Sequence, residues 1–147
     1  LRDLEMAGLS WSRLTEFHAR HKLILCSHDQ NKARALGSEL AAAHGCDVMD
    51  YFEDYVCGLM SLLKIPASKA NHVNVLEHIR GYLKQQLDKD DKQELTESIL
   101  AYRMGQLPLI VPVTLLRHYF RKHPHEYISQ SYYLYPHPAE LMLLNSL

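Results

Sequence analysis

Long apolar runs, paired cysteines and strand-like alternation are largely missing from this sequence. No uninterrupted apolar run reaches about 18 residues, so we expect no transmembrane helix. The N-terminus has neither the charged nor the apolar region of a secretory signal peptide. Cys26, Cys46 and Cys57 are scattered and form no Cys-x-x-Cys pair, which argues against a disulfide framework and a cysteine-ligated metal site. They favour a reducing, cytoplasmic setting.

Motifs for nucleophilic, phosphate and zinc chemistry are also missing. The chain contains no Gly-x-Ser-x-Gly, no glycine-rich phosphate loop and no His-Glu-x-x-His. Cys26 and His28 are two residues apart and would face different ways on a helix, so we expect the Cys26 thiol to be inert. We therefore expect no catalytic residue, no cofactor and no metal in this chain, and no catalysis by the chain alone.

Acidic residues are missing from one long segment, 98–125, although the formal net charge of the chain is only -1. That segment contains Arg103, Arg117, Arg121 and Lys122, whereas five acids lie just before it, between positions 88 and 97. A local basic segment favours a polyanionic partner. The alternative is two oppositely charged solvated faces.

What is present is helical periodicity over most of a 147-residue chain, a length typical of one domain. We predict an all-α fold, a single bundle of about six helices with a Tyr/Pro-rich C-terminal tail and residues 1–9 as a linker or helix start. Short connections at Gly45, Pro66, Asp88 and Gly105 predict antiparallel neighbours. The expected helices cover 11–27, 30–44, 47–66, a segment after the N-cap Ser68, 90–104, 108–123, 126–131 and a last turn at 139–144.

Segment 71–82 predicts a helix with two unlike faces. An apolar stripe contains His72, Val75, Leu76, Ile79 and Leu83, and the opposite side carries Asn71, Asn74, His78, Gly81 and Tyr82. Asn and Gly weaken helix interiors, so a face rich in them is expected to have a role. It either touches a ligand or forms hydrogen bonds to another helix.

Ten histidines are an unusually large share of this sequence. His18, His21 and His28 fall on or beside the apolar stripe of segment 11–27, where they either line a polar groove or form partly buried hydrogen bonds. Lys22 lies one turn after His18, and a cation beside two histidines suggests an anionic ligand. A lysine whose stem covers apolar surface is the alternative.

Tyrosines follow the basic helix predicted at 108–123, and five of the nine lie between positions 119 and 135. Basic residues neutralise phosphates, and exposed tyrosines stack on unpaired bases. The alternative is that most of these tyrosines pack the C-terminal tail onto the bundle.

Four motifs resemble the YbgA-like family, a bacterial domain of unknown function, over nearly the whole chain from about Gly8. They are Phe17-His18-x3-Lys22-x5-His28, Asn71-His72-x-Asn74-Val75-Leu76-x-His78-x2-Gly81-Tyr82, Tyr102-Arg103-x-Gly105-x2-Pro108-Leu109-x2-Pro112-x5-His118-Tyr119 and Tyr133-Leu134-x-Pro136-His137-Pro138-x-Glu140-Leu141. The resemblance predicts one YbgA-like domain over residues 1–147.

That family occurs alone or fused behind a cysteine-rich domain similar to iron–sulfur desulfidases that act on thiolated pyrimidines. The resemblance therefore implies an accessory domain that presents thiolated tRNA to a desulfidase-like domain, in the same chain or as a partner. The chain starts at Leu1 rather than Met, as expected of a domain cut from such a fusion.

Our leading hypothesis is a non-catalytic domain that binds RNA, with tRNA as the expected species. The residues predicted to contact nucleic acid are Lys22, Asn74, His78, Tyr82, Arg103, Arg117, Arg121 and Lys122. One rival is a small-molecule anion site or enzyme that uses His18, Lys22, His78 and Arg103, and a polar pocket would also draw on His28, Asn71 and His118. A second rival is a protein-interaction domain.

Overall fold

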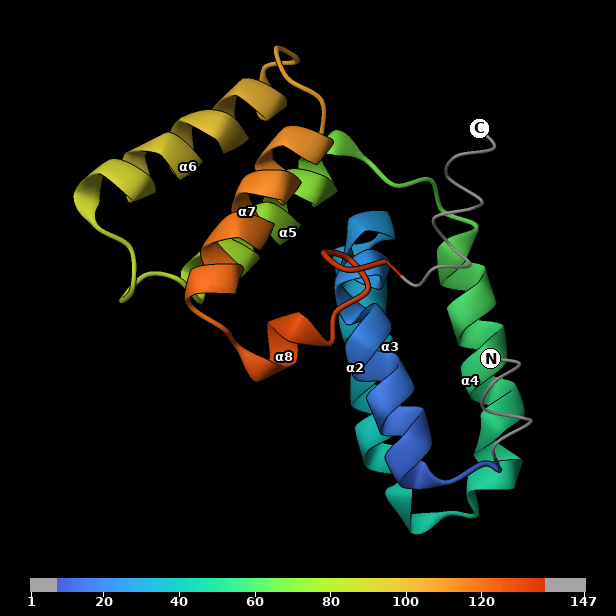
Figure 1. Ribbon diagram of the computed structural model, residues 1–147. Helices are drawn as coiled ribbons and strands as arrows, with labels where there is room; N and C mark the ends of the chain where they lie inside the picture. Colours follow the sequence, from blue (N-terminus) through green and yellow to red (C-terminus); the bar gives the residue numbers. More distant parts are fainter. Residues whose placement is uncertain (1–7, 137–147) are drawn as a thin grey trace.

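Residues 8–136 are described by a computed structural model built of helices joined by short connections (Figure 1). The helices are α2 (Trp11–His28), α3 (Gln30–Ala42), the 3₁₀ turn η1 (Ala43–Gly45), α4 (Val48–Leu63), α5 (Lys69–Gly81), α6 (Lys89–Arg103), α7 (Ile110–Lys122) and α8 (Glu126–Ser129). No strand occurs in this range, which confirms the all-α prediction. The turn predicted at 139–144 lies outside the described residues, as do His137, Pro138 and the first seven positions.

Side-chain caps start most of these helices. Ser10, Asp29, Asp47, Ser68 and Asp88 each accept a hydrogen bond from a backbone N–H in the first turn that follows. A cap of this kind contributes about 1 kcal/mol. The N-cap predicted at Ser68 is confirmed, and the cap at Asp88 makes α6 begin one residue earlier than expected.

Two glycines that were expected to end helices behave differently. Gly105 has φ +77 and follows α6, and the next N–H bonds back to the carbonyl of Ala101, which completes a Schellman motif. Gly45 closes η1 without a positive φ, so it does not act as a left-handed cap. Pro112 is the third residue of α7, where its missing N–H costs no helical hydrogen bond.

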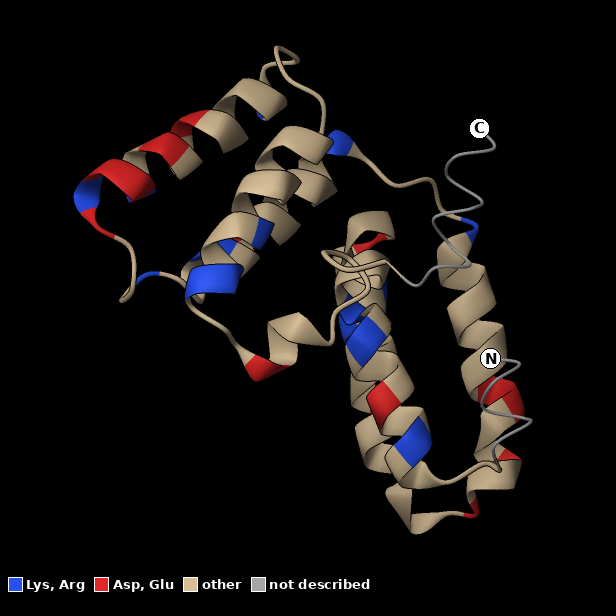
Figure 2. Cartoon of the chain, in the orientation of Figure 1, with Lys and Arg blue, Asp and Glu red and all other residues tan. Residues whose placement is uncertain are grey.

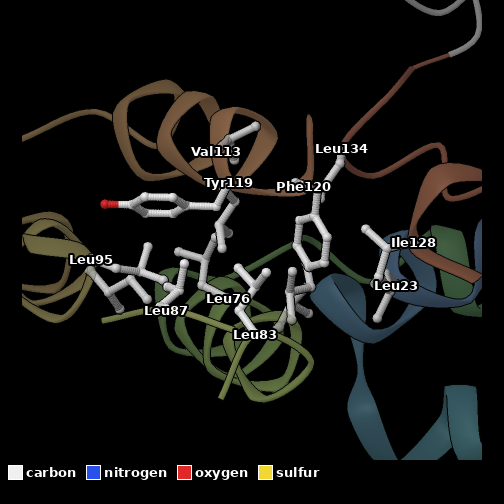
Figure 3. Packing of buried hydrophobic residues seen from close by; sticks show 14 of the residues in the cluster. Leu23, Leu76, Leu83, Leu87, Leu95, Val113, Tyr119, Phe120, Ile128 and Leu134 are labelled. Carbon is white, nitrogen blue, oxygen red and sulfur yellow. The ribbon is translucent and has the colours of Figure 1, made fainter. Parts of the chain in front are cut away.

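The buried apolar side chains form two clusters. One joins α2, α3 and α4 through residues such as Leu14, Leu36 and Tyr55. The other joins α5, α6, α7 and α8 and also receives one side chain of α2 (Figure 3). The labelled members in the figure include Leu23 from α2, Leu76 from α5, Leu95 from α6, Phe120 from α7 and Ile128 from α8.

Helix α2 connects the two clusters. Leu14 and Leu25 pack in the cluster of α3 and α4, Leu23 packs in the cluster of α5 to α8, and the Cys26 side chain contacts both. Helix α5 consequently packs along α2, α6 and α7. The connection at Pro66 therefore does not make α4 and α5 close antiparallel neighbours, contrary to the prediction, because the apolar stripe of α5 is covered by other helices.

Candidate functional site

The polar face of α5 divides into an inward part and an outward part. Asn71 is half-buried, as is His72 on the adjacent apolar stripe, whereas Asn74, His78 and Gly81 are exposed. The His72 Nδ1 atom lies 2.8 Å from the Tyr133 hydroxyl, so this end of the helix is held by the C-terminal segment. The inward part therefore serves packing, and contact with a ligand stays a prediction for the exposed part.

Hydrogen bonds tie the start of α5 to the end of α2. The Asn71 amide nitrogen donates to the His28 carbonyl at 3.2 Å, and the Ser68 N–H donates to the Ser27 carbonyl at 3.3 Å. The His28 Nδ1–H donates to the Ile65 carbonyl at 2.6 Å. Asn71 and His28 thus fasten the α4–α5 connection to α2 rather than opening into a pocket.

A groove of about 240 Å³ lies between α2, α3 and α5, which we call the basic groove. Within the described part of the chain, its lining contains two cations and no carboxylate. The lining residues are Lys22, Leu23, Cys26, Gln30, Arg34, Asn74, Val75 and His78. Lys22 and Arg34 both act on the Cys26 thiol, where they oppose the burial that raises its pKa, so the two cations lie within electrostatic range of one group. An anion entering this groove meets positive charge from two helices.

Aromatic rings continue from the basic groove along the end of α5. The His78 and Tyr82 rings meet edge to face with centroids 5.5 Å apart, and the Tyr82 ring lies 4.5 Å from that of His125. Lys122 precedes His125 by three residues, a stretch that spans at most about 11 Å. The exposed end of α7, Arg121 and Lys122, is therefore close to this row of rings.

Four of the predicted residues lie away from the basic groove. Arg103 is the last residue of α6, at the opposite end of the antiparallel α6–α7 pair from Arg121 (Figure 1). Arg117 is half-buried, and its Nε–H donates to the Leu134 carbonyl. His118 lies on the outer side of α7, between α6 and α7. His18 is buried between α2, α3 and α4. The anion site of the rival hypothesis, which needs His18, Lys22, His78 and Arg103 together, is therefore not assembled.

His18 packs where three helices meet. It is 7% exposed, its Nδ1 lies 2.9 Å from the Tyr55 hydroxyl, and its Nε2 has no hydrogen-bond partner among residues 8–136. A Cβ at Gly37 would lie 3.1 Å from that Nε2, so glycine lets α3 approach α2 closely here. Burial lowers the pKa of His18 to about 4, with further contributions from Lys22 and His21. Burial also lowers the pKa of His72, and the nearby His28 adds to this effect.

Most of the tyrosines after position 118 pack the C-terminal segment onto the bundle, which is the alternative left open above. Tyr119 is buried, and its hydroxyl donates to the Asp91 carbonyl at 3.4 Å. Tyr132 contacts the His21 ring and lies under the Arg20 guanidinium. Burial raises the pKa of Tyr127 to about 12. Tyr82, from the helix face, is the better stacking candidate.

Arg34 and Gln30 were missed by sequence reasoning. They are four residues apart on α3 and form a polar strip beside the buried Ala33 and Leu36. That spacing was visible, but nothing local indicated that the strip would meet Lys22. Only the antiparallel packing of α2 and α3 brings the two cations together.

Two further observations concern residues 8–136 only. None of the helices there has the length and apolar character needed to cross a bilayer. No group of three His, Cys, Asp or Glu side chains in the same range is arranged to hold a metal ion.

Comparison with known proteins identifies the family. The family described as "Protein of unknown function (DUF1722)" matches residues 22–138. The chain is 33% identical to the "Uncharacterized protein YbgA" of Escherichia coli (strain K12), over 99% of this chain and 87% of that protein. The chain belongs to the YbgA-like family. No solved structure matches it.

Proposed function

We propose that this domain binds RNA, with tRNA as the expected species, and that the basic groove is its contact surface. The supporting observation is the convergence of Lys22 and Arg34 on a carboxylate-free groove that Asn74 and His78 also line. Phosphates neutralise such cations, and amide and imidazole groups hydrogen-bond to sugars and base edges. Tyr82 supplies a ring at the groove's end on which an unpaired base can stack.

The proposal gives this domain a binding role and no chemistry. Catalysis would come from an iron–sulfur desulfidase-like domain, in the same chain or as a partner, that removes sulfur from modified nucleosides in the bound RNA. The three cysteines are free thiols, and Cys46 and Cys57 are exposed, which suits work in the reducing cytoplasm.

Fluorescence anisotropy with labelled tRNA across a salt series tests the proposal. The paired substitution Lys22→Ala and Arg34→Ala should lower the affinity by roughly 10- to 100-fold. It should also reduce the slope of log affinity against log salt by about 1.4, since each phosphate contact to single-stranded RNA contributes about 0.7. Lys32→Ala with Lys64→Ala is the matched control, because both lysines are exposed and lie outside the groove.

Three outcomes would count against RNA binding. The first is an affinity without salt dependence, and the second is equal loss in the control pair. The third is a free nucleoside monophosphate that binds as tightly as a 12-residue single-stranded RNA, which would support the small-anion alternative instead. Circular dichroism of each variant separates lost binding from lost helix.

A further inference from the structure

A second groove lies on the outer side of the α6–α7 pair and has a different character. It measures about 780 Å³ and is open to solvent. Its apolar end is built from Leu107, Ile110 and Val111, where α6 passes into α7. Its other end carries Glu94 and Glu97. We call it the acidic–apolar groove.

Exposed apolar side chains are concentrated near the apolar end of this groove, and two of them, Ile110 and Val111, line it. Four of the eight large hydrophobic residues that are exposed among positions 8–136 lie between 100 and 111, namely Leu100, Met104, Ile110 and Val111. Ile110 is 55% exposed and Met104 is 66% exposed. Contiguous exposed apolar surface of this kind marks interaction sites. Single exposed residues need no such explanation.

The carboxylates at the other end are not neutralised by neighbours. Within residues 8–136, Glu97 accepts a hydrogen bond from Gln93 at 3.0 Å, and neither Glu94 nor Glu97 forms a salt bridge. Figure 2 shows that acidic residues gather on the first half of α6, at the end of the α6–α7 pair where α7 carries its basic residues. An anionic polymer would be repelled here, so this groove is separate from the proposed RNA surface.

The dimensions of the groove suit a helix. Ile110 and His118 both line the groove and are eight residues apart on α7, which corresponds to about 12 Å. A helix of about ten residues that lies between α6 and α7 would pack its apolar stripe against both of them. Its apolar residues would meet the Ile110 end, and its cations would meet Glu94 and Glu97.

We propose that the acidic–apolar groove docks an amphipathic helix of a partner protein, apolar at one end and basic at the other. Charge complementarity selects this occupant over a second copy of the chain. The exposed apolar residues Met49 and Met60 lie on α4, together with the acids Asp50, Glu53 and Asp54. That helix would bring like charges to Glu94 and Glu97.

A displayed library of random 14-residue peptides, selected against the full chain and counter-selected on Ile110→Asp, tests this proposal. Enriched peptides should carry apolar residues at helical spacing and Lys or Arg at one end. Ile110 begins α7, where Asp suits the helix dipole, so the variant should fold. Met49→Asp is the matched control, since Met49 is also exposed and in a first turn.

An enriched peptide, synthesised with a fluorophore, gives the quantitative test by anisotropy. Ile110→Asp should weaken its binding about tenfold or more, as expected for an interface anchor. Met49→Asp should leave the binding unchanged. Glu94→Lys with Glu97→Lys should weaken binding of the basic peptide and strengthen that of a peptide whose Lys and Arg are replaced by Glu.

Several results would overturn the proposal. They are no enrichment against the wild-type chain, enrichment of acidic peptides, and full binding by Ile110→Asp. Self-association in sedimentation that Ile110→Asp abolishes would show that a second copy covers the groove. The Lys22→Ala and Arg34→Ala variant should bind the peptide normally, so this proposal and RNA binding fail independently.

Discussion

The basic groove and the acidic–apolar groove differ in how they are assembled. The first is enclosed by three helices, and its cations Lys22 and Arg34 come from two of them. The second is an open trough along one helix pair, with charge at one end and apolar side chains at the other. Runs of like charge along the sequence therefore do not indicate where these two grooves lie. The acid-free segment 98–125 places Ile110 and Val111 in the acidic–apolar groove and no residue in the basic one.

The two grooves also differ in the histidines of the helices that form them. The helices of the basic groove contain His18 and His72, whose pKa values are lowered by burial, whereas the acidic–apolar groove contains only the exposed His118. Acid should therefore destabilise the helices that build the basic groove.

Lowering the pH from 7 to 5 should reduce the free energy of unfolding by about 2 kcal/mol through His18 alone. In the folded chain the pKa of His18 is about 4, so its imidazole stays neutral, whereas the unfolded chain binds this proton below about pH 6.5. The stability is thus present above pH 6.5 and lost as the pH falls towards 4. His72, also lowered, contributes in the same direction. Urea unfolding at a series of pH values measures the loss.

Two variants show whether this loss belongs to the buried histidine. His18→Phe should flatten the dependence between pH 7 and 5, even if it lowers stability at pH 7 by leaving the Tyr55 hydroxyl unpaired. His118→Gln should leave the dependence unchanged, because His118 is exposed. An unaltered slope in His18→Phe would contradict the assignment.

Local sequence patterns predicted the helices well, because caps and apolar stripes act within a few residues. Ser68 begins α5 as expected, and Gly105 ends α6. The errors arose where tertiary packing decided. The short connection at Pro66 predicted α4 and α5 as neighbours, but α5 packs on α2, α6 and α7 instead.

Prediction of the candidate site was partial for the same reason. Lys22, Asn74 and His78 do meet in the basic groove, since each was placed on the correct face of its own helix. Arg34 was missed because only the packing of α3 on α2 brings it there. We predicted Arg117 on a charged face. Its side chain is half-buried instead, and its Nε–H donates a hydrogen bond to the Leu134 carbonyl. The sequence gives no signal for such a tertiary hydrogen bond.

Two asparagines on α5 provide a sharper internal comparison. Asn71→Ala should cost about 1 kcal/mol of stability, because it removes the hydrogen bond to the His28 carbonyl. Asn74→Ala should change stability by less than about 0.5 kcal/mol, since Asn74 is exposed and Ala is the better helix former. Only Asn74→Ala should weaken RNA binding at full stability. Thermal unfolding and anisotropy on both variants decide this, and a reversed pattern would contradict the division of the face.

The smallest effect is a change in the reactivity of one thiol. Cys26 lines the basic groove, and burial raises its pKa, so iodoacetamide should modify it several-fold more slowly than the exposed Cys46 and Cys57. With tRNA present at its Kd, half of the protein is free, and the rate at Cys26 should fall by about twofold. Cys57 should keep its rate, and a peptide in the acidic–apolar groove should protect neither thiol. A thiol is protected only by a ligand that covers it. If the peptide protects Cys26, or if tRNA protects Cys57, the two surfaces are therefore not separate.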